Sequence, residues 1–169
     1  MPAPSAQPAP PELGHAQPDG ALLFCGTNLR VRVALLKPGV VLASAQGEVA
    51  GARDERVETA LLAELDRQLE QVGTLTLFAD LRGSPHMPTT SRKKIAQWMR
   101  RHQARLLPSH ALVKPGMIES ALAVISMLVG GGLVRIHTQP QTFLDLLKKV
   151  APKLSELPQV PELPERVEP

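Results

Sequence analysis

The chain has 169 residues, of which 43% are hydrophobic and 21% charged, and its formal net charge is +3 at pH 7. This length predicts one globular domain with tails rather than two domains. The only cysteine, Cys25, excludes an internal disulfide and a cysteine-based zinc site.

Prolines indicate the tails. They crowd the first twenty residues and the last nineteen, in stretches with no regular apolar period. We therefore predict a disordered tail over residues 1–23, a folded domain over 24–150 and a second disordered tail over 151–169. The start of the chain lacks the basic residues and continuous apolar run of a secretory signal, which favours the reducing cytoplasm.

The apolar pattern predicts alternating strands and helices. The expected strands cover residues 29–36, 40–49, 75–80, 111–113 and 133–137, and the expected helices cover 53–72, 90–106, 117–129 and 141–150. The order β-β-α-β-α-β-α-β-α indicates a single α/β domain, in which a mostly parallel sheet with an N-terminal hairpin is covered by about four helices.

The apolar stretch 117–134 approaches the length of a membrane span, so it is either such a span or a core helix. Glu119 near its start and three glycines from Gly130 leave only about 13 apolar residues, which fits a core helix better. Such a helix is apolar nearly all round and needs two covering layers, so a homodimer is one prediction.

The most informative segment runs from the third expected strand into the following helix. An apolar run ends on Asp80, crosses the loop that contains Arg82, Ser84 and His86, and enters a helix that opens with three hydroxyl residues. In α/β folds, the carboxyl end of a strand followed by a helix N-terminus is where ligands and partners bind.

The element order and several segments resemble STAS domains, the fold of bacterial anti-sigma-factor antagonists, and within that family the STAS-like proteins of myxobacteria. The resemblance covers about residues 29–147 and rests on four segments: 78–82 (FADLR), 98–102 (WMRRH), 110–114 (HALVK) and 132–136 (GLVRI). It implies a regulatory, non-enzymatic domain. In such antagonists a kinase phosphorylates a serine in an Asp-Ser-Ser-Gly motif at the start of the helix after the third strand. Here the corresponding residues are Pro88, Thr89, Thr90, Ser91 and Arg92, so hydroxyl groups are present but the motif is not.

Thr89, Thr90 and Ser91 therefore have two interpretations. A hydroxyl at a helix start accepts a hydrogen bond from an unpaired backbone N–H, typically worth about 1 kcal/mol. Alternatively, one of them is phosphorylated, and the phosphate is held by the helix dipole and by the neighbouring cations.

Positive charge is concentrated in one part of the chain. No Asp or Glu occurs from Leu81 to Ile118, whereas cations are frequent there, among them Arg82, Arg92, Lys93, Lys94, Arg100 and Arg101. A basic face attracts phosphates, anionic lipids or acidic proteins, although it is also typical of a plain solvated helix. The scarcity of aromatic residues and the lack of a DNA- or RNA-binding signature argue against nucleic acid.

The sequence contains no convincing catalytic or metal-binding set. Asp80 and His86 are a possible acid/base pair, but no nucleophile accompanies them. Three histidines, His86, His102 and His110, do not have metal-ligand spacing, and His102 belongs with Trp98 to an apolar helix stripe that predicts core packing. We expect no metal and no cofactor.

Two functions follow. The first is a non-enzymatic regulatory or scaffolding module that binds a protein partner through the loop after the third strand and the basic helix. Its predicted contacts are Asp80, Arg82, Ser84, His86, Arg92, Lys93, Lys94, Arg100 and Arg101. The alternative is a domain that uses the same cations to bind anionic lipid or another anion, with an apolar pocket under the Met-rich helix.

Overall fold

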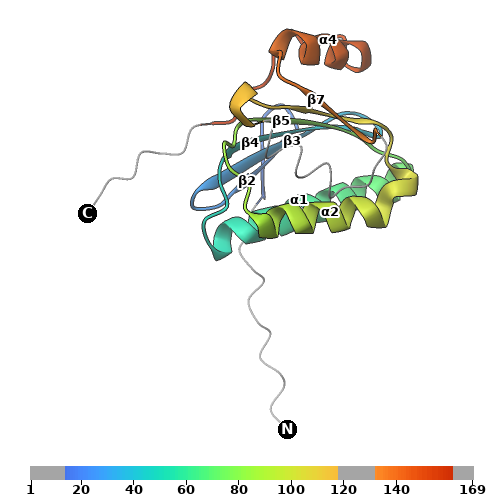
Figure 1. Ribbon diagram of the computed structural model, residues 1–169. Helices are drawn as coiled ribbons and strands as arrows, with labels where there is room; N and C mark the ends of the chain where they lie inside the picture. The colour runs from blue at the N-terminus through green and yellow to red at the C-terminus, as the bar shows by residue number, and fades with distance from the viewer. Residues whose placement is uncertain (1–13, 118–131, 162–169) are drawn as a thin grey trace.

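The computed structural model describes residues 14–117 and 132–161, which form one seven-stranded sheet with helices on both faces (Figure 1). The strands are β1 (Gly14–Ala16), β2 (Leu22–Cys25), β3 (Leu29–Lys37), β4 (Val40–Gly47), β5 (Thr76–Gly83), β6 (Ser109–Leu112) and β7 (Val134–His137). The α-helices in this part of the chain are α1 (Ala52–Val72), α2 (Thr89–His102) and α4 (Pro140–Val150). Two short 3-10 turns follow α2 and β6, at Gln103–Arg105 and Pro115–Met117.

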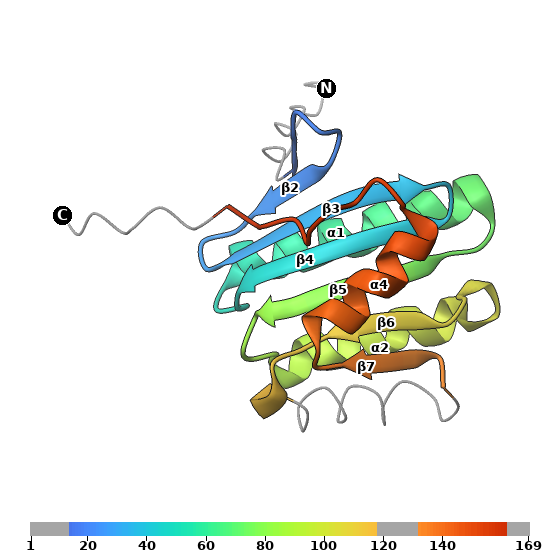
Figure 2. The same ribbon diagram turned by 90° about the horizontal axis from the view of Figure 1, so that it is seen from above.

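The strands lie in the sheet in the same order as in the chain. Strands β1 to β4 pair antiparallel, and β4 to β7 pair parallel. Right-handed connections between parallel strands place their helices on the same face of a sheet when each strand is added on the same side of the previous one. We therefore expect α1 and α2 on one face. Figure 1 shows them together on one face, and Figure 2 shows α4 crossing the opposite face. The two faces are called here the α1/α2 face and the α4 face.

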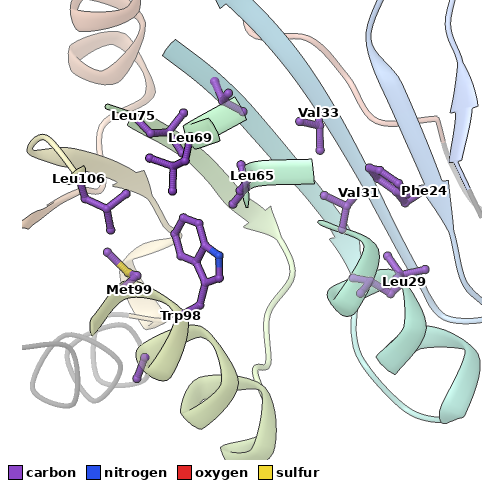
Figure 3. Close-up of a cluster of buried hydrophobic side chains, with 13 residues drawn as sticks. Phe24, Leu29, Val31, Val33, Leu65, Leu69, Leu75, Trp98, Met99 and Leu106 are labelled. Carbon is purple, nitrogen blue, oxygen red and sulfur yellow. The ribbon is translucent and has the colours of Figure 1, made fainter. Parts of the chain in front are cut away.

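The larger core lies on the α1/α2 face (Figure 3). Trp98 and Met99 of α2 are each 4% exposed and pack with Leu65 and Leu69 of α1 against the sheet. The predicted role of Trp98 as a core anchor is confirmed, and its indole Nε1 donates a hydrogen bond to Asp66 Oδ1 at 2.7 Å. His102 packs on Trp98, with ring centroids 5.0 Å apart, and its Nε2 lies 2.9 Å from Asp66 Oδ1 without forming a hydrogen bond among the described residues.

A second core lies on the α4 face. Phe143 and Leu147 of α4 are fully buried against Leu42, Phe78 and Leu112, which come from β4, β5 and β6. Residues 151–161 then leave α4 without regular structure and run along β3 and β4 (Figure 2). Two partly buried leucines of this segment, Leu154 and Leu157, pack on the same cluster.

One buried carboxylate joins the start of α1 to the loop between β2 and β3. Asp54 is fully buried and accepts hydrogen bonds from the backbone N–H groups of Asn28, Leu29 and Ala50 and from the Asn28 side chain, at 2.9 to 3.2 Å. Burial by itself would raise the pKa of Asp54, but these hydrogen bonds outweigh it and hold the pKa below its usual value. Gly26 must lack a side chain, because a Cβ there would lie 2.1 Å from Asp54 Oδ1.

The α/β class and most of the predicted elements are confirmed, but the order is not. The predicted hairpin corresponds to β3 and β4, and two further strands, β1 and β2, precede it. They are joined by a turn at Pro18-Asp19-Gly20, in which Gly20 has φ 85°. Pro-Asp-Gly is a strong turn signal, and the proline-rich composition of this region obscured it.

The domain boundaries also differ from the prediction. The sheet begins at Gly14 rather than Phe24, and the packed segment 151–161 extends the fold beyond Val150. Among the described residues there are three α-helices rather than about four. The expected helix 117–129, with the predicted homodimer surface and the apolar pocket beneath it, lies almost wholly outside the described residues.

Candidate functional site

The predicted Asp80 and Arg82 lie on the α4 face at the carboxyl end of β5. Asp80 is 7% exposed, and its carboxylate accepts two hydrogen bonds from the Arg82 guanidinium, from Nε at 2.9 Å and from a terminal nitrogen at 2.8 Å. This bidentate ion pair raises the pKa of Arg82, so the guanidinium stays charged. The pair neutralises Asp80 and fixes the orientation of Arg82.

This arrangement corrects the predicted acid/base pair. The Asp80 carboxylate is bonded to Arg82, whereas His86 is exposed in the loop that leads to α2. Ser84 has a structural contact of its own, because its hydroxyl donates to the carbonyl of Gly47 at 2.7 Å. The first half of the loop is thus tied to the sheet, and its exposed part is the stretch that contains His86.

The hydroxyl residues at the start of α2 do not cap the helix. The N-cap position is Pro88, and no side chain forms a capping hydrogen bond there. Ser91 is only 1% exposed and its hydroxyl has no hydrogen-bond partner among the described residues. Thr89 and Thr90 are exposed, so these two of the three predicted phosphorylation candidates are accessible to a kinase.

The cations of α2 divide into an inner and an outer group. Arg92 donates from Nε to the carbonyl of Met87 at 3.0 Å, and Lys94 lies 3.5 Å from Glu58 of α1. The outer group consists of Lys93, Arg100 and Arg101, which are exposed. These three residues are called here the basic surface of α2.

A groove of about 260 Å³ runs between α1 and α2 beside this surface. Leu62, Ala63 and Trp98 provide apolar lining, while Lys94 and Arg101 contribute positive charge from α2. The groove therefore combines a partly apolar lining with positive charge from α2. One carboxylate of α1, Asp66, also lies on the lining, where it accepts a hydrogen bond from Trp98.

The predicted contact residues are thus not brought together at one place. Asp80 and Arg82 lie on the α4 face, whereas the basic surface of α2 lies across the sheet from them. Strand alternation explains the division: even-numbered residues of β5, such as Phe78, Asp80 and Arg82, point away from α1 and α2.

The sequence prediction missed the residues that surround Asp80 and Arg82. Asp80 and Arg82 line a cleft of about 650 Å³ at the carboxyl ends of the parallel strands. The missed residues on its lining are Ser44 and Gln46 of β4, Lys114 after β6, and Gln141 in the first turn of α4. The signal was available in principle, because polar residues follow apolar ones on one side of β4 and β5 near their ends, as in Leu42, Ser44 and Gln46.

Two histidines that the prediction did not pair are in contact on the α4 face. His110 Nδ1 of β6 and His137 Nε2 of β7 lie 2.9 Å apart, and Phe78 stacks on His110 with ring centroids 5.0 Å apart. Burial lowers the pKa of both imidazoles, and the positive charge of Arg135 lowers both further. Neutral imidazoles can share one hydrogen bond in this geometry.

Together these features define an α/β protein whose seven described strands follow chain order, with a basic helix surface on one face and a polar cleft on the other. Comparison of the sequence with protein-family models and with curated proteins finds no match for this chain. None of the described helices is long and apolar enough to cross a bilayer.

Proposed function

We propose that this chain is a non-enzymatic, cytoplasmic module that binds an acidic protein surface through the basic surface of α2 and the groove beside it. The observation that supports it best is the position of Lys93, Arg100 and Arg101. They project from the helix that borders an apolar-lined groove, in a sequence segment without acidic residues. Positive charge at the rim speeds association with an acidic partner, and apolar lining slows its release.

The regulatory part of the proposal concerns Thr89 and Thr90. Both are exposed in the first turn of α2, close in sequence to Arg92 and Lys93. A phosphate at either position would be stabilised by the helix N-terminus and would neutralise part of the basic surface, so phosphorylation would weaken binding of an acidic partner. The resemblance to STAS-like proteins is a further part of this proposal, since a regulatory binding role is what that family implies.

The test uses the double variant Lys93→Glu/Arg101→Glu. Arg92 and Lys94 are left intact, because their contacts with Met87 and Glu58 support the fold. The full chain is immobilised and exposed to native cytosol at about 0.1 M and about 1 M salt, between which the screening length falls from about 10 Å to about 3 Å. We expect one protein to be retained from the cytosol by the wild type at both salt concentrations and lost with the double variant.

The matched control is Lys149→Glu/Lys153→Glu, which reverses two exposed cations on α4 and the segment that follows it. It should retain the partner. If both double variants lose the partner equally, only net charge matters and the proposal is wrong. Retention of anionic lipid or nucleic acid alone, at low salt alone, would instead favour the lipid- or anion-binding alternative, which vesicles of phosphatidylserine and phosphatidylcholine would then measure directly.

A further inference from the structure

A cleft on the α4 face is not used by the proposed function. It has a volume of about 650 Å³ and lies where β4, β5 and β6 end. The first turn of α4 and residues 156–160 form its other walls. The carboxyl edge of parallel strands is the usual ligand position in α/β folds, and the volume is within the range of small-molecule sites.

The buried hydroxyl of Ser44 indicates that this cleft binds a ligand. It lines the cleft from β4, is 3% exposed, and its hydroxyl has no hydrogen-bond partner among the described residues. The sheet register places Ser44 directly beside Asp80, whose carboxylate is already engaged by Arg82. A buried hydroxyl without a partner destabilises the fold, so its presence on the cleft wall is explained if a ligand provides the missing hydrogen bond.

The cleft lining carries two cations and two carboxylates, and the cations are the groups that can hold an anion. The ion pair neutralises Asp80 but leaves part of the Arg82 guanidinium facing the cleft, and Lys114 adds an exposed cation at the end of β6. Helix α4 begins at Pro140 on the cleft wall without a side-chain N-cap, so the positive end of its dipole is directed there. The exposed carboxylate of Glu156 is the remaining charge on the lining and can accept hydrogen bonds from ligand hydroxyl groups.

Gln46 and Gly83 complete the site. A Cβ at Gly83 would lie 2.2 Å from Gln46 Oε1, so glycine at this position is what allows the Gln46 amide to rest against the end of β5. The amide adds a neutral donor and acceptor to the cleft lining.

We propose that this cleft binds a small organic anion, through a phosphate or carboxylate group held by Arg82, Lys114 and the N-terminus of α4, with Ser44 bonded to a polar atom of the same ligand. The site is on the opposite face of the sheet from the basic surface of α2, and it does not depend on the proposed function. Bound ligand would add contacts between the strands, α4 and residues 156–160.

The test is a titration of the isotope-labelled full chain, followed through its backbone amide NMR signals. Inorganic phosphate and citrate are the probes for the two anionic groups, with sodium chloride at equal ionic strength as the reference. We expect saturable shifts at Ser44, Lys114 and Gln141. Lys114→Glu should weaken binding about tenfold or more, because it replaces a charge-assisted contact by repulsion.

The matched control is Lys37→Glu. Lys37 is an exposed lysine at the last position of β3, paired with the first residue of β4, and it therefore lies at the opposite end of the strands from the cleft. It should bind both probes as the wild type does. A second variant, Ser44→Ala, removes the unpartnered hydroxyl, so its unfolding temperature should not fall while its affinity does. The proposal is wrong if neither probe gives saturable shifts at the cleft, or if Lys114→Glu and Lys37→Glu weaken binding equally, which would be the behaviour of an adventitious ion only.

Discussion

At the scale of single residues, His110 and His137 show how a tertiary contact changes the chemistry of a side chain. Their facing nitrogens are 2.9 Å apart, and the rings of Phe78 and Phe143 lie against them. Burial lowers the pKa of His110 most, followed by the charges of His137 and Arg135. A first proton can be shared between the two nitrogens, but a second would place two cations in contact beneath α4.

This geometry predicts that protonation of these two histidines lowers the stability of the fold as the pH decreases. Their pKa values are lower in the folded protein than in the unfolded chain, where histidine titrates near about 6.5, so protons bind preferentially to the unfolded state. Stability should therefore be fully present above about pH 6.5 and fall as the pH decreases below that value. Urea unfolding between about pH 7 and about pH 5 measures the slope, which should approach about one proton per imidazole at most.

Two substitutions separate this contribution from other titrations. His137→Leu removes one of the paired imidazoles and should make the pH slope shallower, even if stability at neutral pH also changes. His86→Gln, which replaces an exposed loop histidine, is the matched control. Equal slopes for the wild type and His137→Leu would contradict the prediction.

At the scale of elements, the segment after α4 has a structural role that its composition does not indicate. Residues 151–161 contain no helix or strand, yet Leu154 and Leu157 pack on the cluster formed by Phe143 and Leu147. The Arg30 side chain also donates a hydrogen bond to the carbonyl of Pro161, at 3.3 Å. The segment is therefore bound along the α4 face and forms one wall of the cleft.

We expect Leu157→Ala to lower the free energy of unfolding by about 1 kcal/mol. A fully buried leucine contributes roughly 1.5–3 kcal/mol, and a partly buried one contributes less. Lys153→Ala, at an exposed position of the same segment, should change it by less than about 0.5 kcal/mol. Chemical denaturation of the full chain measures both. Identical stabilities for Leu157→Ala and the wild type would show that the segment does not pack on the sheet in solution.

At the scale of the whole molecule, the order of the strands decides what lies on each face. Because the parallel strands follow chain order, α1 and α2 lie on one face of the sheet. Helix α4 and residues 151–161 lie on the other face. The proposed protein-binding surface and the proposed anion site are consequently separated by the full thickness of the sheet.

This separation predicts that the two activities are lost independently. Lys93→Glu/Arg101→Glu should abolish retention of the protein partner and leave phosphate and citrate binding within about twofold of the wild type, because additivity holds for distant sites. Lys114→Glu should have the reverse effect. Measuring both activities in both variants gives the result, and loss of both activities in either variant would mean that the two faces are coupled.

Much of this architecture follows from local sequence patterns. Alternation over residues 29–36 and helical spacing from Val57 to Leu69 predict β3 and α1, because these periodicities depend only on which face of an element is buried. Gly73, with φ 91°, ends α1 as expected, since a left-handed residue at this position strongly favours glycine. The short strands β1 and β2 were not predicted, because strands of three and four residues show too little periodicity to be distinguished from a loop.

What the sequence by itself determined was therefore the α/β class, the main helices and strands, and the positive charge of α2. The tertiary structure decided which residues meet: it paired Asp80 with Arg82 rather than His86, buried Ser91, placed His110 against His137, and brought Ser44, Lys114 and the start of α4 around one cleft. The physical reason is that local patterns report on the burial of single elements, whereas a site depends on strand order, register and the choice of sheet face, which are set by contacts between residues far apart in the chain.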